Sequence, residues 1–178
     1  LIGLGLASLA GSPVRRLVLN DVGPTLQADA LHRIGAYLGL PLRWGSVEEA
    51  AAYLLTISEG FGPHTTEQWL QLTRPQVKPD GRRFKPHYDP RIAEPFRAIT
   101  PEMASIGQAA LWHSDDAMTC ATLLLRGVKS DLLSHDTALA MTRRGPKAKL
   151  VEFDGIGHAP MLVQPQQIAP VREFLLSP

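Results

Sequence analysis

The sequence is poor in cysteine, in net charge and in long apolar runs. Its 178 residues include one cysteine, Cys120, which rules out an intrachain disulfide and nearly excludes a zinc site built on thiolates. Lys and Arg total 18 and Asp and Glu total 17, so the net charge of +1 gives no electrostatic reason to expect nucleic acid or an anionic membrane as partner. No apolar run approaches the ~20 residues of a membrane span. Hydrophobic residues make up 44%, enough to bury a core.

The chain opens on an apolar run, residues 1–10, rather than on Met. The basic segment that precedes the apolar core of a signal peptide is missing, so a buried helix is the favoured interpretation. Gly11 and Pro13 are expected to end this helix. We therefore expect further sequence before Leu1. The lone cysteine favours a cytoplasmic protein, although a removed signal peptide remains an alternative.

Consecutive apolar residues predict three short strands that are covered on both faces, as in a parallel sheet. They span residues 16–20, 121–127 and 149–153. Helices are expected after Ser134 and from about Ile168 to Leu175, the last one kinked or divided by Pro170. Between the first two strands, residues 25–114 are predicted as successive helices without a strand. The predicted fold class is α/β: parallel strands with flanking helices and a helical insertion. Three strands make a poor sheet, so further strands are expected before Leu1.

Polar side chains follow each predicted strand. Asp21 follows the first, Asp131 the second and His158 the third. In open parallel sheets the ligand site lies beyond the carboxyl ends of the strands. A carboxylate and an imidazole on neighbouring loops can form the orienting and basic members of a catalytic triad.

The segment around His158 is the most specific pattern in the chain. Residues 155–160 (GIGHAP), which precede the terminal helix, resemble the catalytic-histidine loop of the α/β-hydrolase superfamily. Residues 123–131 resemble the acid-bearing strand and loop of that family, and residues 16–24 resemble its sixth strand, after which many members insert a helical cap. The resemblance covers essentially the whole chain. It implies a division into core (1–24), helical cap (25–114) and core (115–178).

The resemblance also implies the roles of the site residues. It assigns catalysis to Asp131 and His158, with no cofactor and no metal. Some members of the family supply the acid after the sixth strand, which makes Asp21 the alternative acid. For Asp21, however, a turn formed with Gly23 is the favoured interpretation.

The nucleophile of the family lies in a G-x-S-x-G elbow, and this sequence contains no such motif. Ser105 matches half of it but lies in a stretch predicted as helix, and we reject it. Residues 1–10 instead resemble the helix that follows the elbow. The nucleophile and both oxyanion-hole donors are therefore expected before Leu1, and the chain alone is expected to be inactive. Its expected partners are the missing N-terminal part of the same protein and a small-molecule substrate, with homodimerisation left open.

The predicted function is hydrolysis of a small apolar ester, lactone or related carbonyl compound by a capped serine hydrolase. Related chemistries of the same fold are alternatives: carbon–carbon bond hydrolases, haloalkane dehalogenases and epoxide hydrolases. The last group uses cap tyrosines as acids, and Tyr37, Tyr53 and Tyr88 all lie in the expected cap. A non-catalytic binding module is a further alternative. Some cap aromatic residues are expected to line an apolar pocket.

Overall fold

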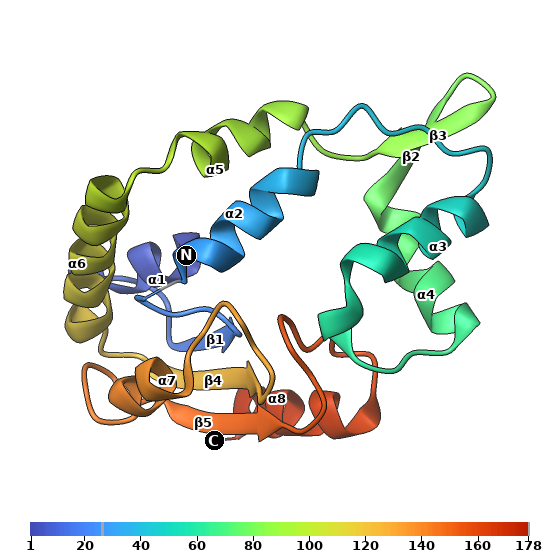
Figure 1. Ribbon diagram of the computed structural model, residues 1–178. Helices are drawn as coiled ribbons and strands as arrows, with labels where there is room; N and C mark the ends of the chain where they lie inside the picture. Colours follow the sequence, from blue (N-terminus) through green and yellow to red (C-terminus); the bar gives the residue numbers. More distant parts are fainter. Residues whose placement is uncertain (26, 178) are drawn as a thin grey trace.

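A three-stranded parallel sheet lies at the lower side of the protein in Figure 1. The structure is a computed structural model that describes residues 1–25 and 27–177. The strands are β1 (Arg16–Asn20), β4 (Ala121–Gly127) and β5 (Lys149–Phe153), in the order β1-β4-β5. Leu19 pairs with Leu124, and Leu125 pairs with Val151. All three predicted strands and their parallel arrangement are confirmed.

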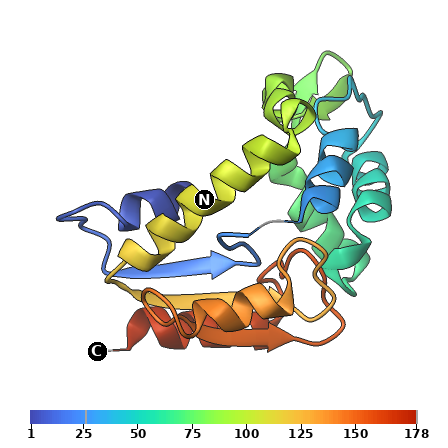
Figure 2. The same cartoon turned by 60° about the vertical axis from the view of Figure 1, so that its left-hand side comes forward.

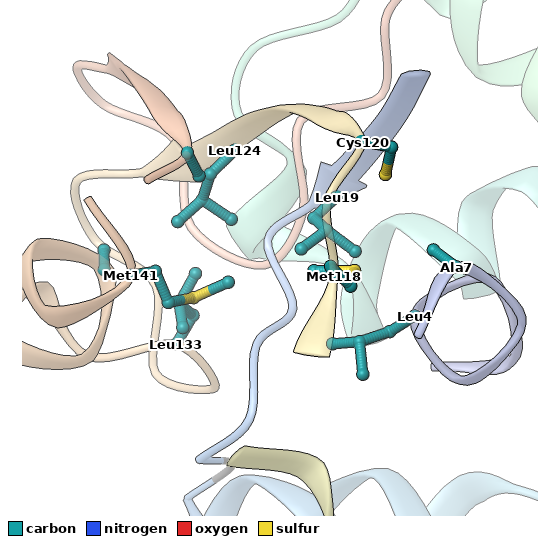
Figure 3. Close-up of a cluster of buried hydrophobic side chains, with 10 residues drawn as sticks. Leu4, Ala7, Leu19, Met118, Cys120, Leu124, Leu133 and Met141 are labelled. Atoms are coloured by element: carbon teal, nitrogen blue, oxygen red, sulfur yellow. The ribbon is translucent and has the colours of Figure 1, made fainter. Parts of the chain in front are cut away.

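Successive leucines of β4 point to opposite faces of the sheet, and each face is covered by helices (Figure 2). Leu124 packs in a cluster with Leu4 of α1 (Ile2–Ala7) and Met141 of α7 (His135–Met141) (Figure 3). Leu123 and Leu125 pack on the other side, against α8 (Pro165–Leu176). Because both faces are buried, the apolar residues of β4 run consecutively instead of alternating. Cys120, just before this strand, is buried.

The segment between β1 and β4 is mostly helical. Its helices are α2 (Ala28–Tyr37), α3 (Val47–Ile57), α4 (Thr66–Thr73), α5 (Glu94–Ala98) and α6 (Pro101–Ala117), with short 3-10 turns η1 (Glu59–Phe61), η2 (Arg74–Gln76) and η3 (Pro90–Ala93). Ser46, Thr65 and Thr100 cap α3, α4 and α6 by accepting a backbone N–H with their side chains. No helix among the described residues is long and apolar enough to cross a membrane.

Two details of the segment 25–114 differ from the prediction. A hairpin of β2 (Val77–Asp80) and β3 (Arg83–Pro86) interrupts the helices, so the expectation of an all-helical insertion was wrong there. The hairpin is short and polar, and its stabilising contact is non-local: Trp44 pairs with Phe84 through two backbone hydrogen bonds of 2.9 Å. The expected boundary at residue 114 falls inside α6, whose residues Leu111 and Trp112 pack against the sheet cluster.

The helix ends also differ in part from the expectation. Helix α1 ends at Ala7, before Gly11, and α8 continues through Pro170 without division. Pro170 is the sixth residue of α8. A proline at that position removes one intrahelical hydrogen bond, yet the packing of Val171 and Phe174 against the sheet holds the helix together.

Asp115, near the end of α6, is a buried acid. It is fully buried, and neither carboxylate oxygen has a hydrogen-bond partner among the described residues. Burial, reinforced by Asp116, raises the pKa of Asp115 from 3.8 to about 6, against the opposing effect of Arg144. The folded state therefore binds this proton more tightly than the unfolded chain. The protonated Asp115 carboxyl therefore stabilises the folded state fully at pH values below its pKa in the unfolded chain. This stabilisation is lost as the pH rises through about 6.

We expect Asp115→Asn to remove this loss of stability. At pH 7.5 the variant should be more stable than the parent by about 2 kcal/mol, because no charge is buried. Denaturant unfolding at pH 4.5 and pH 7.5 measures the difference, and Asp154→Asn, at an exposed position, is the control. An unchanged pH dependence in Asp115→Asn would contradict this account of Asp115.

Candidate active site

Three loops meet at the carboxyl edge of the sheet, where the arrows of β1, β4 and β5 end (Figure 1). Each loop contributes one polar side chain: Asp21 after β1, Ser130 after β4 and His158 after β5. The His158 ring nitrogen Nδ1 lies 2.8 Å from Asp21 Oδ2. The His158 side chain is 23% exposed and can be reached from the site, whereas the Asp21 side chain is 0% exposed and lies buried beneath it.

Asp21 is held in place from several directions. Its backbone N–H donates to the Leu125 carbonyl at 2.8 Å, so pairing with β4 continues one residue past β1. Its φ of 56° lies in the left-handed region, which aspartate tolerates better than most residues. The Gly127 N–H donates to Oδ1 at 2.9 Å, and the Ser130 hydroxyl donates to Oδ2 at 2.6 Å. These hydrogen bonds offset the cost of burying the carboxylate.

The histidine loop folds back across the end of β4 to reach Asp21. The Lys129 N–H donates to the Ile156 carbonyl at 2.8 Å, and the Asn20 side chain donates to the Pro160 carbonyl at 2.8 Å. A Cβ at Gly127 would meet the carbonyl oxygens of Ile156 and Gly157, so only glycine permits this close approach. The crossing carries His158 from the end of β5 to the end of β1, over the strand that lies between them.

The expected contact between Asp131 and His158 is not formed. Asp131 is half exposed, its Oδ2 accepts a hydrogen bond from Arg33 Nε on α2 at 2.9 Å, and it forms an ion pair with Arg33 Nη2 at 2.7 Å. The carboxylate beside the imidazole is that of Asp21, for which the sequence favoured a turn. Asp131 does not reach His158 because the loop after β4 directs Ser130 toward Asp21, and the next residue, Asp131, toward Arg33 on α2.

A signal in the sequence could have separated the two acids. Asp21 comes directly after the last residue of β1, so its side chain is held at the buried edge of the sheet. Asp131 comes four positions after Gly127, the last residue of β4, where the chain has already turned outward. Distance from the strand end, more than order along the chain, indicates which carboxylate is buried.

The segment that follows α3 touches the histidine loop. The Gly157 N–H donates to the Gly60 carbonyl at 2.6 Å. Next to Gly60, Phe61 lines a cavity of about 160 Å³ that is also lined by Tyr37, Tyr53 and Tyr88. Burial raises the pKa of Tyr37, although Arg33 opposes the shift, so this hydroxyl stays protonated at neutral pH. This aromatic cavity therefore adjoins, at Phe61, the short segment that contacts the His158 loop.

A second polar cluster belongs to the scaffold. The buried Arg126 donates from Nη1 to Glu152 at 2.7 Å and from Nε to the Leu133 carbonyl at 2.9 Å. Burial of Glu152 favours a higher pKa, but the hydrogen bonds from Arg126 and His135 hold that pKa below its usual value. Within residues 1–25 and 27–177, no group of three or more His, Cys, Asp or Glu side chains is arranged to bind a metal.

A parallel sheet covered on both faces, with a buried acid and a histidine on its carboxyl edge, is the architecture of the α/β-hydrolase fold, and this chain has that fold. Over 178 residues it is 51% identical to the 3-hydroxybutyrate-oligomer hydrolase of Cupriavidus necator, covering 98% of this chain and 61% of that protein. No protein-family model matches the chain.

Two solved structures are also similar. An α/β hydrolase from Novosphingobium aromaticivorans is 34% identical with a TM-score of 0.83, over 98% of this chain and 61% of that one. A putative hydrolase from Rickettsia typhi is 28% identical with a TM-score of 0.82, over 98% of this chain and 58% of that one. The chain thus spans about three fifths of the length of each relative.

Proposed function

We propose that the protein containing this chain is a serine ester hydrolase, and that His158 and Asp21 are its base and its acid. The observation that carries the proposal is the 2.8 Å contact between His158 Nδ1 and the buried Asp21 carboxylate. Because Nδ1 is engaged, the other ring nitrogen, Nε2, is left to accept a proton from a nucleophile. Asp21 replaces Asp131 as the acid in this proposal.

The mechanism follows the chemistry of acyl transfer. A serine hydroxyl, which we place before Leu1, attacks the ester carbonyl while His158 Nε2 takes its proton. The imidazolium then gives that proton to the departing alkoxide, which leaves an acyl-enzyme. His158 next takes a proton from water, the hydroxide attacks the acyl carbonyl, and the proton returns to the serine as the acid product leaves. Asp21 fixes the ring orientation and stabilises the positive charge in both halves.

Short 3-hydroxybutyrate esters are the substrate class that we propose first. The name of the 51% identical relative supports this choice, since that protein is called a hydrolase of 3-hydroxybutyrate oligomers. The cavity next to Phe61 has an aromatic and aliphatic lining, with Tyr37, Tyr53, Tyr88, Ser58 and Gln76 as its polar members. Such a lining suits a compact acyl chain that carries ester and hydroxyl groups. We further propose that residues 25–114 act as the cap over the site.

Epoxide hydrolysis is the second candidate, and one observation favours it. Tyr37, Tyr53 and Tyr88 line the same cavity, and tyrosine hydroxyls are protonated at neutral pH and can donate hydrogen bonds to an epoxide oxygen. In that chemistry an aspartate would stand in place of the serine. The nucleophile therefore distinguishes the two candidates.

A serine-directed fluorophosphonate probe tests the proposal in the intact protein. We expect covalent labelling of one serine, located by peptide mass spectrometry, together with release of 3-hydroxybutyrate from its dimer and trimer. Prior heat denaturation should abolish labelling, which controls for non-specific reaction. Absence of labelling together with turnover of styrene oxide would favour the epoxide hydrolase. Absence of labelling and of all turnover would favour a binding module.

A further inference from the structure

The hydroxyl of Ser130 donates its proton to Asp21, because its two acceptor positions are already occupied. Its oxygen accepts the Leu133 N–H at 3.1 Å and the Leu132 N–H at 3.3 Å. A serine hydroxyl has one proton and two lone pairs, so these two donors use its acceptor capacity. The proton must then point to Asp21 Oδ2, which lies 2.6 Å away. The two backbone N–H groups therefore fix Ser130 as the donor in its hydrogen bond with Asp21.

Ser130 and His158 form hydrogen bonds with the same carboxylate oxygen of Asp21. Both donate to Asp21 Oδ2, at 2.6 and 2.8 Å, while Oδ1 accepts the Gly127 N–H at 2.9 Å. The carboxylate therefore cannot rotate about its Cβ–Cγ bond without losing hydrogen bonds on both oxygens. A second donor on Oδ2 also neutralises part of the negative charge that faces the imidazole.

We propose that Ser130 is a positioning residue of the active site: it locks the rotamer of Asp21 and moderates the charge that Asp21 presents to His158. The proposal rests on the proposed function, in which Asp21 and His158 act as acid and base. The role belongs to the loop after β4, which thus contributes to the site through Ser130 and not through Asp131. Ser130 does not touch the substrate in this account and acts through Asp21.

Loss of the hydroxyl has a predictable direction. In Ser130→Ala, Asp21 Oδ2 keeps one donor, so more negative charge faces the imidazolium and stabilises it. The acid limb of the pH profile of kcat/KM should move to higher pH. The Nδ1–H···Oδ2 bond should strengthen, so the low-field proton resonance of His158 should move further downfield. We expect kcat to fall about tenfold, because the carboxylate is less well oriented, while KM stays within about twofold.

The test uses two comparisons in the intact protein. Ser130→Ala is compared with Ser134→Ala, which removes the cap of α7 but does not contact Asp21. Ser130→Thr and Ser130→Val have nearly the same shape and differ in the hydroxyl, so this pair remains informative if the alanine variant folds poorly. Proton NMR without substrate and pH profiles of ester hydrolysis are the readouts.

The expected result is a shifted resonance and a shifted acid limb in Ser130→Ala and Ser130→Val, and parental behaviour in Ser130→Thr and Ser134→Ala. An unshifted resonance in Ser130→Ala, or an equal shift in Ser134→Ala, would overturn the role of Ser130. The NMR measurement needs no turnover, so an inactive protein with the expected resonance shifts would count against the proposed function and not against Ser130.

Discussion

Replacing Asp21 with Asn is expected to lower kcat by about 10⁴-fold in the intact protein, with the fold retained. The amide is close in shape to the carboxylate, but it is neutral and cannot stabilise the imidazolium. Its NH₂ group can also reverse the hydrogen bond to His158 and select the wrong tautomer. Initial rates with saturating 3-hydroxybutyrate dimer measure the effect, and circular dichroism checks the fold.

Asp131→Asn is the matched control for that experiment. Asp131 is half exposed and pairs with Arg33, and exposed ion pairs contribute about 1 kcal/mol or less. We therefore expect kcat within about threefold of the parent. The reverse result, a large loss of kcat in Asp131→Asn and a small loss in Asp21→Asn, would identify Asp131 as the acid, as the sequence favoured.

Replacing His158 with Ala should have a still larger effect on turnover. Without the imidazole there is no base to take the serine proton, and loss of that base in a triad lowers kcat by about 10⁶-fold. Labelling by the fluorophosphonate probe should fall with it, since the same base activates the serine. His135→Ala is the control, because His135 is an exposed histidine that pairs with Glu152. Ester hydrolysis at the parental rate in His158→Ala would refute the assignment of the base.

The strands could be predicted because their burial leaves a direct trace in the sequence. Residues 121–127 are buried almost throughout, and the three consecutive leucines 123–125 within them indicate a strand with helices on both faces. The hairpin at β2 and β3 leaves no such trace. Its pairing partner for Phe84 is Trp44, which is distant in the chain, and local propensity carries no information about that contact.

The location of the site at the edge of the sheet could be predicted from the sequence, but the acid that contacts His158 could not. The rule that ligands bind beyond the carboxyl ends of parallel strands located Asp21, Asp131 and His158 at one edge. The position of Asp21 directly after β1 distinguishes it from Asp131, but the sequence does not show that the histidine loop crosses the end of β4 and reaches β1. That crossing depends on the contact of Gly127 with the backbone at Ile156 and Gly157, a non-local feature.

In the proposed mechanism, Asp21 holds His158 through Nδ1 and leaves Nε2 free as the base. Nitrogen-15 NMR of the histidine side chains in the intact protein tests it most directly, because the two ring nitrogens differ in chemical shift when one carries the proton. We expect neutral His158 to be protonated at Nδ1, Asp21→Asn to abolish this preference and Asp131→Asn to preserve it. A proton on Nε2 in the parent protein, or a preference lost only in Asp131→Asn, would contradict the account.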